Sequence, residues 1–198
     1  MSDTGPTDWD HFGALVSPAT IQCLQRSTSA SRIRHYQVNL VPAMCQTADY
    51  TRALMTGTFE CADEQVESFL DMRSRYRQVV EGCPRLQVVL DEAVVRRRIG
   101  GRDVMRGQVQ ELIALGQGPR LELRLVRFGS GAHVGLRGSF VHLTAADGSK
   151  DDLVYREVDG LDVARDGDHA ARDVADFDRL WKLGLGGADL WDFLRGLW

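Results

Sequence analysis

The residues that decide the fold are Leu86-Gln87-Val88-Val89-Leu90 and, further along the chain, Leu121-Glu122-Leu123-Arg124-Leu125. The first run is short and almost wholly apolar, which is typical of a strand buried on both faces. The second alternates apolar and charged side chains with the period of two of a strand. Between them, after the break at Gly100-Gly101, apolar side chains recur from 104 to 115 at helical spacing. A strand, a helix and a strand in this order predict one right-handed parallel crossover.

A second pair of strands is predicted on the C-terminal side of this unit. Residues 138–145 and 153–158 have strand character and flank Asp147-Gly148-Ser149, whose Asp-Gly pair is typical of a tight hairpin turn. We therefore expect a mixed, mostly antiparallel sheet of about four or more strands within residues 85–160.

The segments before and after the sheet are predicted to be mainly helical. Residues 1–24 are expected to form a loose N-terminal arm, pinned by Trp9 and Phe12, with a helix start at Ser17-Pro18. A helical part then extends to about residue 82, and C-terminal helices occupy 170–198. In the N-terminal helical part, the first apolar positions are Ile21, Leu24, Ile33 and Tyr36, which form a broken helical stripe. The predicted fold class is α+β, with a single ligand-binding-type domain over residues 25–198.

The end of the chain is unusually apolar. Trp191, Leu194, Leu197 and Trp198 continue one stripe to the last residue. Such a stripe must dock either on the body of the protein or on a second subunit, so a homodimer is one of two expectations.

Composition excludes several classes of protein. The 198 residues are 43% apolar and 26% charged, which is ordinary for a globular domain, and the net charge of −4 argues against specific DNA binding. No apolar run is long enough to span a bilayer, and no secretory signal follows Met1, so a cytoplasmic location is expected. The four cysteines lack metal-site spacing and are expected to be reduced thiols, and the sequence predicts no metal and no cofactor.

The sequence contains no phosphate-binding loop, nucleophile elbow or zinc-protease signature. Four local groups of residues are more distinctive. In chain order they are Leu40-Val41-Pro42-Ala43-Met44-Cys45-Gln46-Thr47-Ala48-Asp49-Tyr50; Arg73 with Arg77-Gln78; Val89-Leu90-Asp91-Glu92-Ala93-Val94-Val95 with Gly100 and Met105; and Gly131-Ala132-His133-Val134-Gly135-Leu136 with Gly138-Ser139-Phe140 and Val154-Tyr155-Arg156-Glu157.

In this order, these groups resemble the uncharacterised domain that follows the helix-turn-helix of many actinomycete regulators of the xenobiotic-response-element type. The resemblance covers about residues 25–182. Those regulators are often called antitoxin-like and are often encoded beside a very small partner protein. The resemblance therefore implies a sensor-type module that binds a small molecule or a small partner protein. Only about 24 residues precede the similar part, so no helix-turn-helix and no direct, specific DNA binding are expected.

Glu92 and His133 are the candidate catalytic residues. Glu92 follows the predicted strand 86–90, at the edge of the sheet where α/β folds bind ligands. Burial there would raise the pKa of its carboxyl, so that it could act as an acid or a base, whereas pairing with an arginine such as Arg73 or Arg77 is the alternative. His133 lies in a glycine-rich loop, where it either contacts a ligand and moves a proton or is simply exposed.

The candidate ligand-binding residues are polar side chains in the same groups, namely Gln46, Tyr50, Arg73, Arg77 and Glu157. Helix capping and packing are the alternative roles for Gln46 and Tyr50, and a cross-strand ion pair is the alternative for Glu157. We expect these residues and the two candidate catalytic residues to meet in a pocket between the N-terminal helices and the sheet.

Two functions follow from these observations. The first is a stand-alone module that binds a small molecule or a partner, related to the sensor domain of helix-turn-helix regulators. The second is a small biosynthetic enzyme of specialised metabolism that uses Glu and His acid–base chemistry for a cyclisation or condensation.

Overall fold

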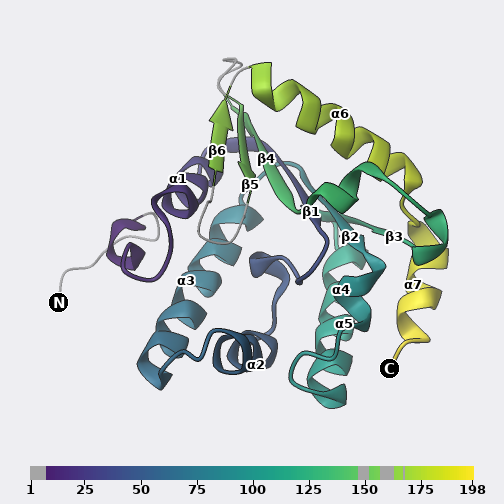
Figure 1. The fold of residues 1–198 in the computed structure, drawn as a ribbon, viewed down its shortest axis with the longest axis horizontal. Helices are drawn as coiled ribbons and strands as arrows, with labels where there is room; N and C mark the ends of the chain where they lie inside the picture. Colours follow the sequence, from purple (N-terminus) through teal and green to yellow (C-terminus); the bar gives the residue numbers. More distant parts are fainter. Residues whose placement is uncertain (1–7, 147–151, 157–162, 167) are drawn as a thin grey trace.

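The computed structural model describes residues 8–146, 152–156, 163–166 and 168–198, and within these ranges it contains one six-stranded sheet covered by helices (Figure 1). The strands are β1 (Ala30–Gln37), β2 (Leu86–Asp91), β3 (Leu121–Val126), β4 (Phe140–Ala145), β5 (Leu153–Arg156) and β6 (Val163–Asp166). The α-helices are α1 (Pro18–Ser27), α2 (Ala48–Thr58), α3 (Asp63–Glu81), α4 (Glu92–Arg96), α5 (Arg102–Gln117), α6 (Asp168–Leu183) and α7 (Gly187–Arg195). Short 3-10 helices are η1 (Asp10–Phe12), η2 (Ala43–Cys45), η3 (Phe128–Ser130) and η4 (Val134–Arg137).

The sheet is mixed and mostly antiparallel, as predicted. Its strand order is β3-β2-β1-β4-β5-β6. The pairs β1–β2 and β2–β3 are parallel, whereas β1–β4, β4–β5 and β5–β6 are antiparallel. Helix α5 connects β2 to β3, which confirms the predicted strand–helix–strand unit. Strands β4 and β5 also pair as predicted, and the expected turn at 147–149 lies outside the described residues.

The helical stripe predicted through Ile33 and Tyr36 is wrong, because residues 30–37 form the central strand β1. Ile33 and Tyr36 are three residues apart, which fits a helix, but in a strand they point to opposite faces of the sheet. Ile33 packs in the larger apolar core and Tyr36 packs in a second, smaller one. A strand that is covered on both faces loses the simple alternation that identifies a strand in sequence.

The two cores lie on opposite faces of the sheet. The larger joins the sheet to α1, α2, α3, α5 and α7, through buried side chains such as Leu24, Leu54 and Leu112. The smaller contains Phe177 and Leu180 of α6 with Tyr36, so α6 covers the other face (Figure 1). Helices therefore lie at both ends of an α+β chain, as predicted.

Both ends of the described chain are packed against the body. Trp9 and Phe12, in the segment expected to be an arm, are buried in the larger core. At the other end, Leu190 and Leu194 of α7 are buried. Trp191 lies so close to Gly116 of α5 that a Cβ there would be 2.5 Å from its ring. The C-terminal stripe thus docks on its own chain. Within the described ranges, no helix is long and apolar enough to cross a membrane.

We predict that docking of α7 is required for stability. Leu190→Ala should lower the free energy of unfolding by about 2–5 kcal/mol, because it leaves a cavity in a core position that is 0% exposed. Urea denaturation followed by circular dichroism measures this loss. Leu183→Ala, at a position that is 42% exposed, is the matched control and should cost less than about 1 kcal/mol. Equal losses in the two variants would contradict the docking.

Candidate functional site

A cavity of about 550 Å³ lies between helices α1–α3 and the sheet, where the sequence predicts a pocket. Its wall combines α1 and the segment before it, strands β1, β4 and β5, the segment between β1 and α2, and the facing sides of α2 and α3 with their connection. Most of the wall is apolar, with lining side chains that include Leu15, Leu24, Leu40, Leu54, Met55, Phe69, Met72 and Val141. A few polar groups interrupt this surface, which is the usual composition of a small-molecule site.

Three polar side chains form a connected row on the strand side of the cavity. His35 and Gln37 are two residues apart on β1, so both point to the face that carries the cavity. The Gln37 side-chain amide donates to His35 Nε2 across 3.1 Å. Ser139 Oγ donates to Gln37 Oε1 (2.8 Å) and accepts from the Val38 backbone N–H (3.1 Å). The backbone N–H directly after β1 therefore fixes the orientation of the row.

His35 is neutral in this row. Burial lowers the pKa of its imidazole to about 3, because the charged form loses its contact with water. An imidazole that accepts at Nε2 carries its proton on Nδ1, and Nδ1 has no hydrogen-bond partner among the described residues. The strand side of the cavity is polar but uncharged at neutral pH.

Two of the predicted ligand-binding residues, Gln46 and Arg73, line the cavity on its helix side. The Gln46 side-chain amide donates to Val41 O (2.7 Å), and its Oε1 accepts from Thr51 Oγ1 (3.0 Å). Arg73 lies on α3, with its guanidinium carbon 5.8 Å from the centre of the Phe69 ring. Among the described lining residues, Arg73 is the one that carries a formal charge.

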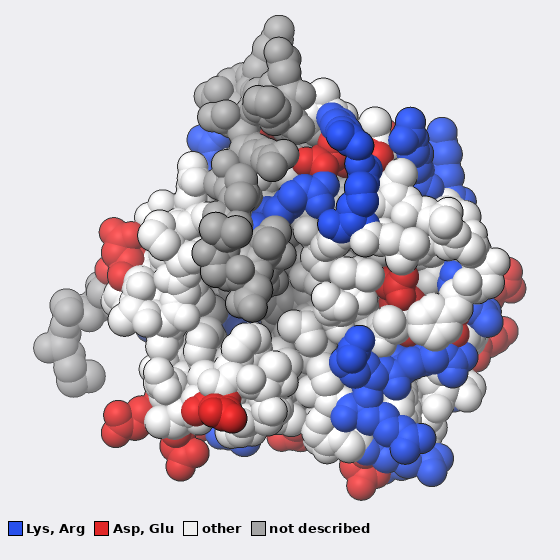
Figure 2. Space-filling view, in the orientation of Figure 1, with Lys and Arg blue, Asp and Glu red and all other residues white. Residues whose placement is uncertain are grey.

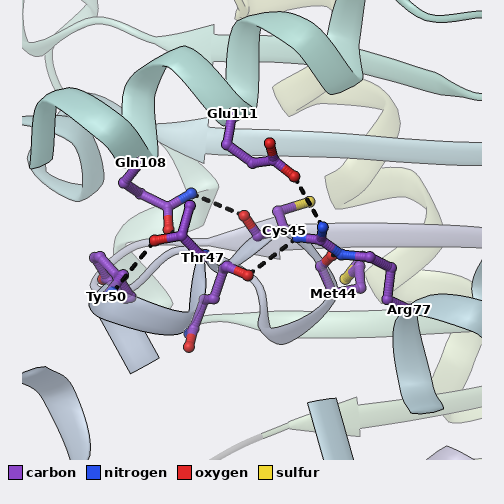
Figure 3. Close-up of polar contacts among 8 residues, drawn as sticks. Met44, Cys45, Thr47, Tyr50, Arg77, Gln108 and Glu111 are labelled. Atoms are coloured by element: carbon purple, nitrogen blue, oxygen red, sulfur yellow. Dashed lines mark hydrogen bonds and ion pairs between the residues drawn. The ribbon is translucent and has the colours of Figure 1, made fainter. Parts of the chain in front are cut away.

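Arg77, another predicted ligand-binding residue, lies behind the cavity wall and holds the segment before α2 in place (Figure 3). Its guanidinium donates to Met44 O (2.9 Å), to Gln46 O (3.0 Å) and to Glu111 Oε1 on α5 (2.8 Å). All three of its donor nitrogens are engaged, so Arg77 shapes the wall and is not among the cavity-lining residues.

The same segment is held from the other side by Gln108 of α5, which is fully buried (Figure 3). Gln108 Nε2 donates to Cys45 O (2.8 Å), and Gln108 Oε1 accepts from the Thr47 backbone N–H (2.8 Å). Tyr50 acts similarly: its buried hydroxyl accepts from the Val41 backbone N–H (3.2 Å). Tyr50 therefore has the packing role that was its alternative, and it does not line the cavity.

Glu92 does not lie in the cavity, and the predicted rise in its pKa is wrong. It is buried at the start of α4, directly after β2. Burial acts to raise the pKa of Glu92, but hydrogen bonds from the Phe128 N–H, Arg96 and Arg127 outweigh it, and the pKa falls below the ordinary value. The carboxylate is thus paired with arginines, though not with Arg73 or Arg77. A carboxylate held ionised in this way is poorly suited to donate a proton.

The other two predicted site residues are also not in the cavity. His133 lies in the loop after β3, with its side chain buried and Nε2 3.6 Å from Asp91 Oδ2. His133 thus lies close to the neighbour of Glu92, at the carboxyl end of β2, and it does not line the cavity with Gln46 and Arg73. Glu157 lies outside the described residues. Among those that are described, no group of three His, Cys, Asp or Glu side chains converges as metal ligands would.

The residues that sequence reasoning missed are His35, Gln37 and Ser139. His35 and Gln37 alternate with Tyr36 and Val38, which is a strand signal. Assigning 30–37 to a strand would have placed both polar side chains on one face.

We predict that Glu92 stabilises the fold as a carboxylate. Glu92→Gln should lower the free energy of unfolding by about 1.5–3 kcal/mol at pH 7, the scale of hydrogen bonds to a charged group. Because folding lowers the pKa of Glu92, this contribution is present above the ordinary value of 4.5 and is lost as the pH falls through the lower folded value. Urea titrations from pH 7 to acid pH measure it.

The matched control is Glu122→Gln, at an exposed carboxylate that lies 3.4 Å from Arg85. It should change the free energy of unfolding by less than about 1 kcal/mol at any pH. A Glu92→Gln variant as stable as the wild type at pH 7 would contradict the prediction.

Comparison with known proteins places the chain in a family. The family described as Domain of unknown function (DUF5753) matches residues 22–196, which is nearly the whole chain. Neither the curated proteins nor the solved structures contain a significant match. The match includes every lining residue of the cavity wall except Ala14, Leu15, Val16, Ser17 and Thr20. Because the match spans far more than half of the sequence, the chain belongs to the DUF5753 family.

Proposed function

We propose that this chain is a small-molecule-binding module of the sensor type, with its site in the cavity between α1–α3 and the sheet. The observation that carries the proposal is the combination of an apolar cavity of about 550 Å³ with an oriented row of buried polar groups. The resemblance to the C-terminal domain of actinomycete regulators of the xenobiotic-response-element type supports the same function.

The cavity suits a largely apolar ligand with one neutral hydrogen-bonding end. Its volume is within the range of about 300–1,000 Å³ in which small-molecule sites fall. The apolar side chains of α2 and α3 favour a ring or an alkyl body. At the strand side, the Gln37 amide retains one N–H after it donates to His35, and this N–H suits a carbonyl or a hydroxyl of the ligand.

The composition of the wall favours binding over catalysis. Among the described lining residues there is no carboxylate, and the imidazole of His35 has a pKa of about 3, so it is not a base matched to neutral pH. Glu92 is not among the lining residues, and its lowered pKa favours the ionised form, so neither observation supports the acid that the biosynthetic alternative requires.

We predict that the neutral fluorescent probe N-phenyl-1-naphthylamine binds in this cavity with one-to-one stoichiometry. Ala43→Phe, which adds a ring at a lining position, should weaken binding at least about tenfold, or about 1.4 kcal/mol, because it fills the space. Fluorescence titration measures the affinity. Ala114→Phe, at an exposed position of α5, adds the same ring outside the cavity and should leave the affinity unchanged.

The melting temperature of each variant establishes that it is folded. A folded Ala43→Phe variant that binds the probe as tightly as the wild type would overturn the assignment of the cavity, as would a wild type without saturable binding. Native mass spectrometry of protein purified from its native host then identifies the natural ligand by its mass.

A further inference from the structure

A second feature of the molecule lies away from the cavity, around the ends of α4 and α7. Arg96 and Arg98 come from α4 and the residues after it, and Arg127 follows β3. They contact two aromatic side chains, Phe193 of α7 and Trp198. We call these five residues the arginine–aromatic surface. Figure 2 shows basic side chains gathered over this part of the molecule, at the lower right of the view.

Glu92 anchors this surface from beneath. Its side chain is only 4% exposed, and its two oxygens accept from Arg96 Nε (2.5 Å) and from Arg127 Nε (3.0 Å). The Phe128 backbone N–H also donates a hydrogen bond to Glu92 Oε2, at 2.8 Å. Each arginine uses only its Nε in this pairing. Within the described chain, the terminal amino groups of Arg96 and Arg127 have no hydrogen-bond partner. Both side chains are nearly half exposed, so these amino groups can be reached from outside.

The aromatic rings hold the guanidinium groups further. The guanidinium carbons of Arg127 and Arg96 lie 4.1 Å and 5.6 Å from the centre of the Phe193 ring. Arg98 lies 5.8 Å from the Trp198 ring, and the indole N–H of Trp198 donates to Val95 O (3.1 Å). Side chains fixed in this way lose little conformational freedom when they bind a partner.

The charge of the surface is unbalanced. The surface carries three guanidinium groups, of which two pair with the buried carboxylate of Glu92, and the terminal amino groups of Arg96 and Arg127 are available for a further anion. Guanidinium groups pair with carboxylates through two parallel hydrogen bonds. The neighbouring Phe128 is 59% exposed and offers an apolar contact beside the charges. Arginine and aromatic side chains together are typical of the residues that dominate protein interfaces.

We propose that the arginine–aromatic surface docks an acidic segment of a partner protein. Carboxylates of the segment pair with Arg96, Arg98 and Arg127, and an apolar side chain of the segment covers Phe128. This proposal does not rest on the proposed small-molecule site, because none of these residues lines the cavity.

A protein segment fits this surface better than a nucleic acid does. The chain has a net charge of −4, and Figure 2 shows acidic side chains beside the basic ones, so a long polyanion meets repulsion around the surface. Single-stranded nucleic acids bind by stacking bases on open aromatic rings. Here arginines lie over the Phe193 and Trp198 rings, which leaves less ring surface for a base.

The test uses a short fluorescein-labelled peptide of repeating Glu-Glu-Leu units and measures fluorescence anisotropy at low salt. The wild type should bind it, and binding should weaken as salt is added. The double variant Arg98→Ala/Arg127→Gln should weaken binding at least about tenfold, since it removes two of the pairing groups. Gln at 127 can still donate to Glu92, so the variant is expected to fold, and its melting temperature verifies this.

The matched control is the pair Arg102→Ala/Arg106→Gln, which removes two exposed arginines from α5 and leaves the affinity within about twofold. Three results would overturn the proposal: no binding of the peptide to the wild type, an equal loss in the control pair, or a peptide with Gln in place of Glu that binds as tightly. Tighter, variant-sensitive binding of oligothymidylate would assign the surface to nucleic acid instead. A dimer that dissociates in the double variant would assign it to a second copy.

Discussion

The structure depends on how one irregular segment is held inside the protein. Residues 38–47 leave the central strand β1 and cross between α3 and α5 before α2 begins, and Val41, Pro42 and residues 44–46 are buried. Buried backbone groups outside regular structure must find partners, because an unpaired group costs free energy. Arg77 and Gln108 supply those partners from opposite sides, and Glu111 balances the charge of Arg77. Without them, the segment would not present Gln46 to the cavity, and α3 and α5 would lose their shared contact.

Local sequence patterns predicted the elements that have one buried and one exposed face, and those that are bounded by clear turn residues. The parallel unit of β2, α5 and β3 and the antiparallel pair β4–β5 have such patterns. Strand β1 has only a short pattern at its end, where His35 and Gln37 alternate with Tyr36 and Val38, because apolar side chains lie on both of its faces. The row formed by His35 and Gln37 was therefore missed together with the strand. Glu92 shows a different limit. Its position after β2 could be predicted, but its pairing with Arg127, which lies 35 residues away, depends on the packing of the loop after β3.

The candidate site shows the same division. Gln46 and Arg73 could be placed at the cavity because they sit among apolar residues on elements that face the sheet. Tyr50 and Arg77 occur in the same groups of residues, but they hydrogen-bond to the backbone behind the cavity wall. Composition alone does not separate lining residues from residues of this second kind.

The two candidate functional regions lie on separate elements of the chain. The cavity is built by α1–α3, whereas the arginine–aromatic surface is built around α4 and α7, so each can change without the other.

The position of β1 at the centre of the sheet has a consequence for how the protein is made. Ile33 pairs with Leu86 on one side and with Leu143 on the other. As the chain emerges from the ribosome, β1 therefore precedes its second neighbour by more than a hundred residues of synthesis. Until β4 has been made, one edge of β1 has no partner strand, and open strand edges of this kind pair with other strands. We therefore expect a fragment that ends after β3 to aggregate more readily than the full chain, because the edge of β1 that β4 covers would be open.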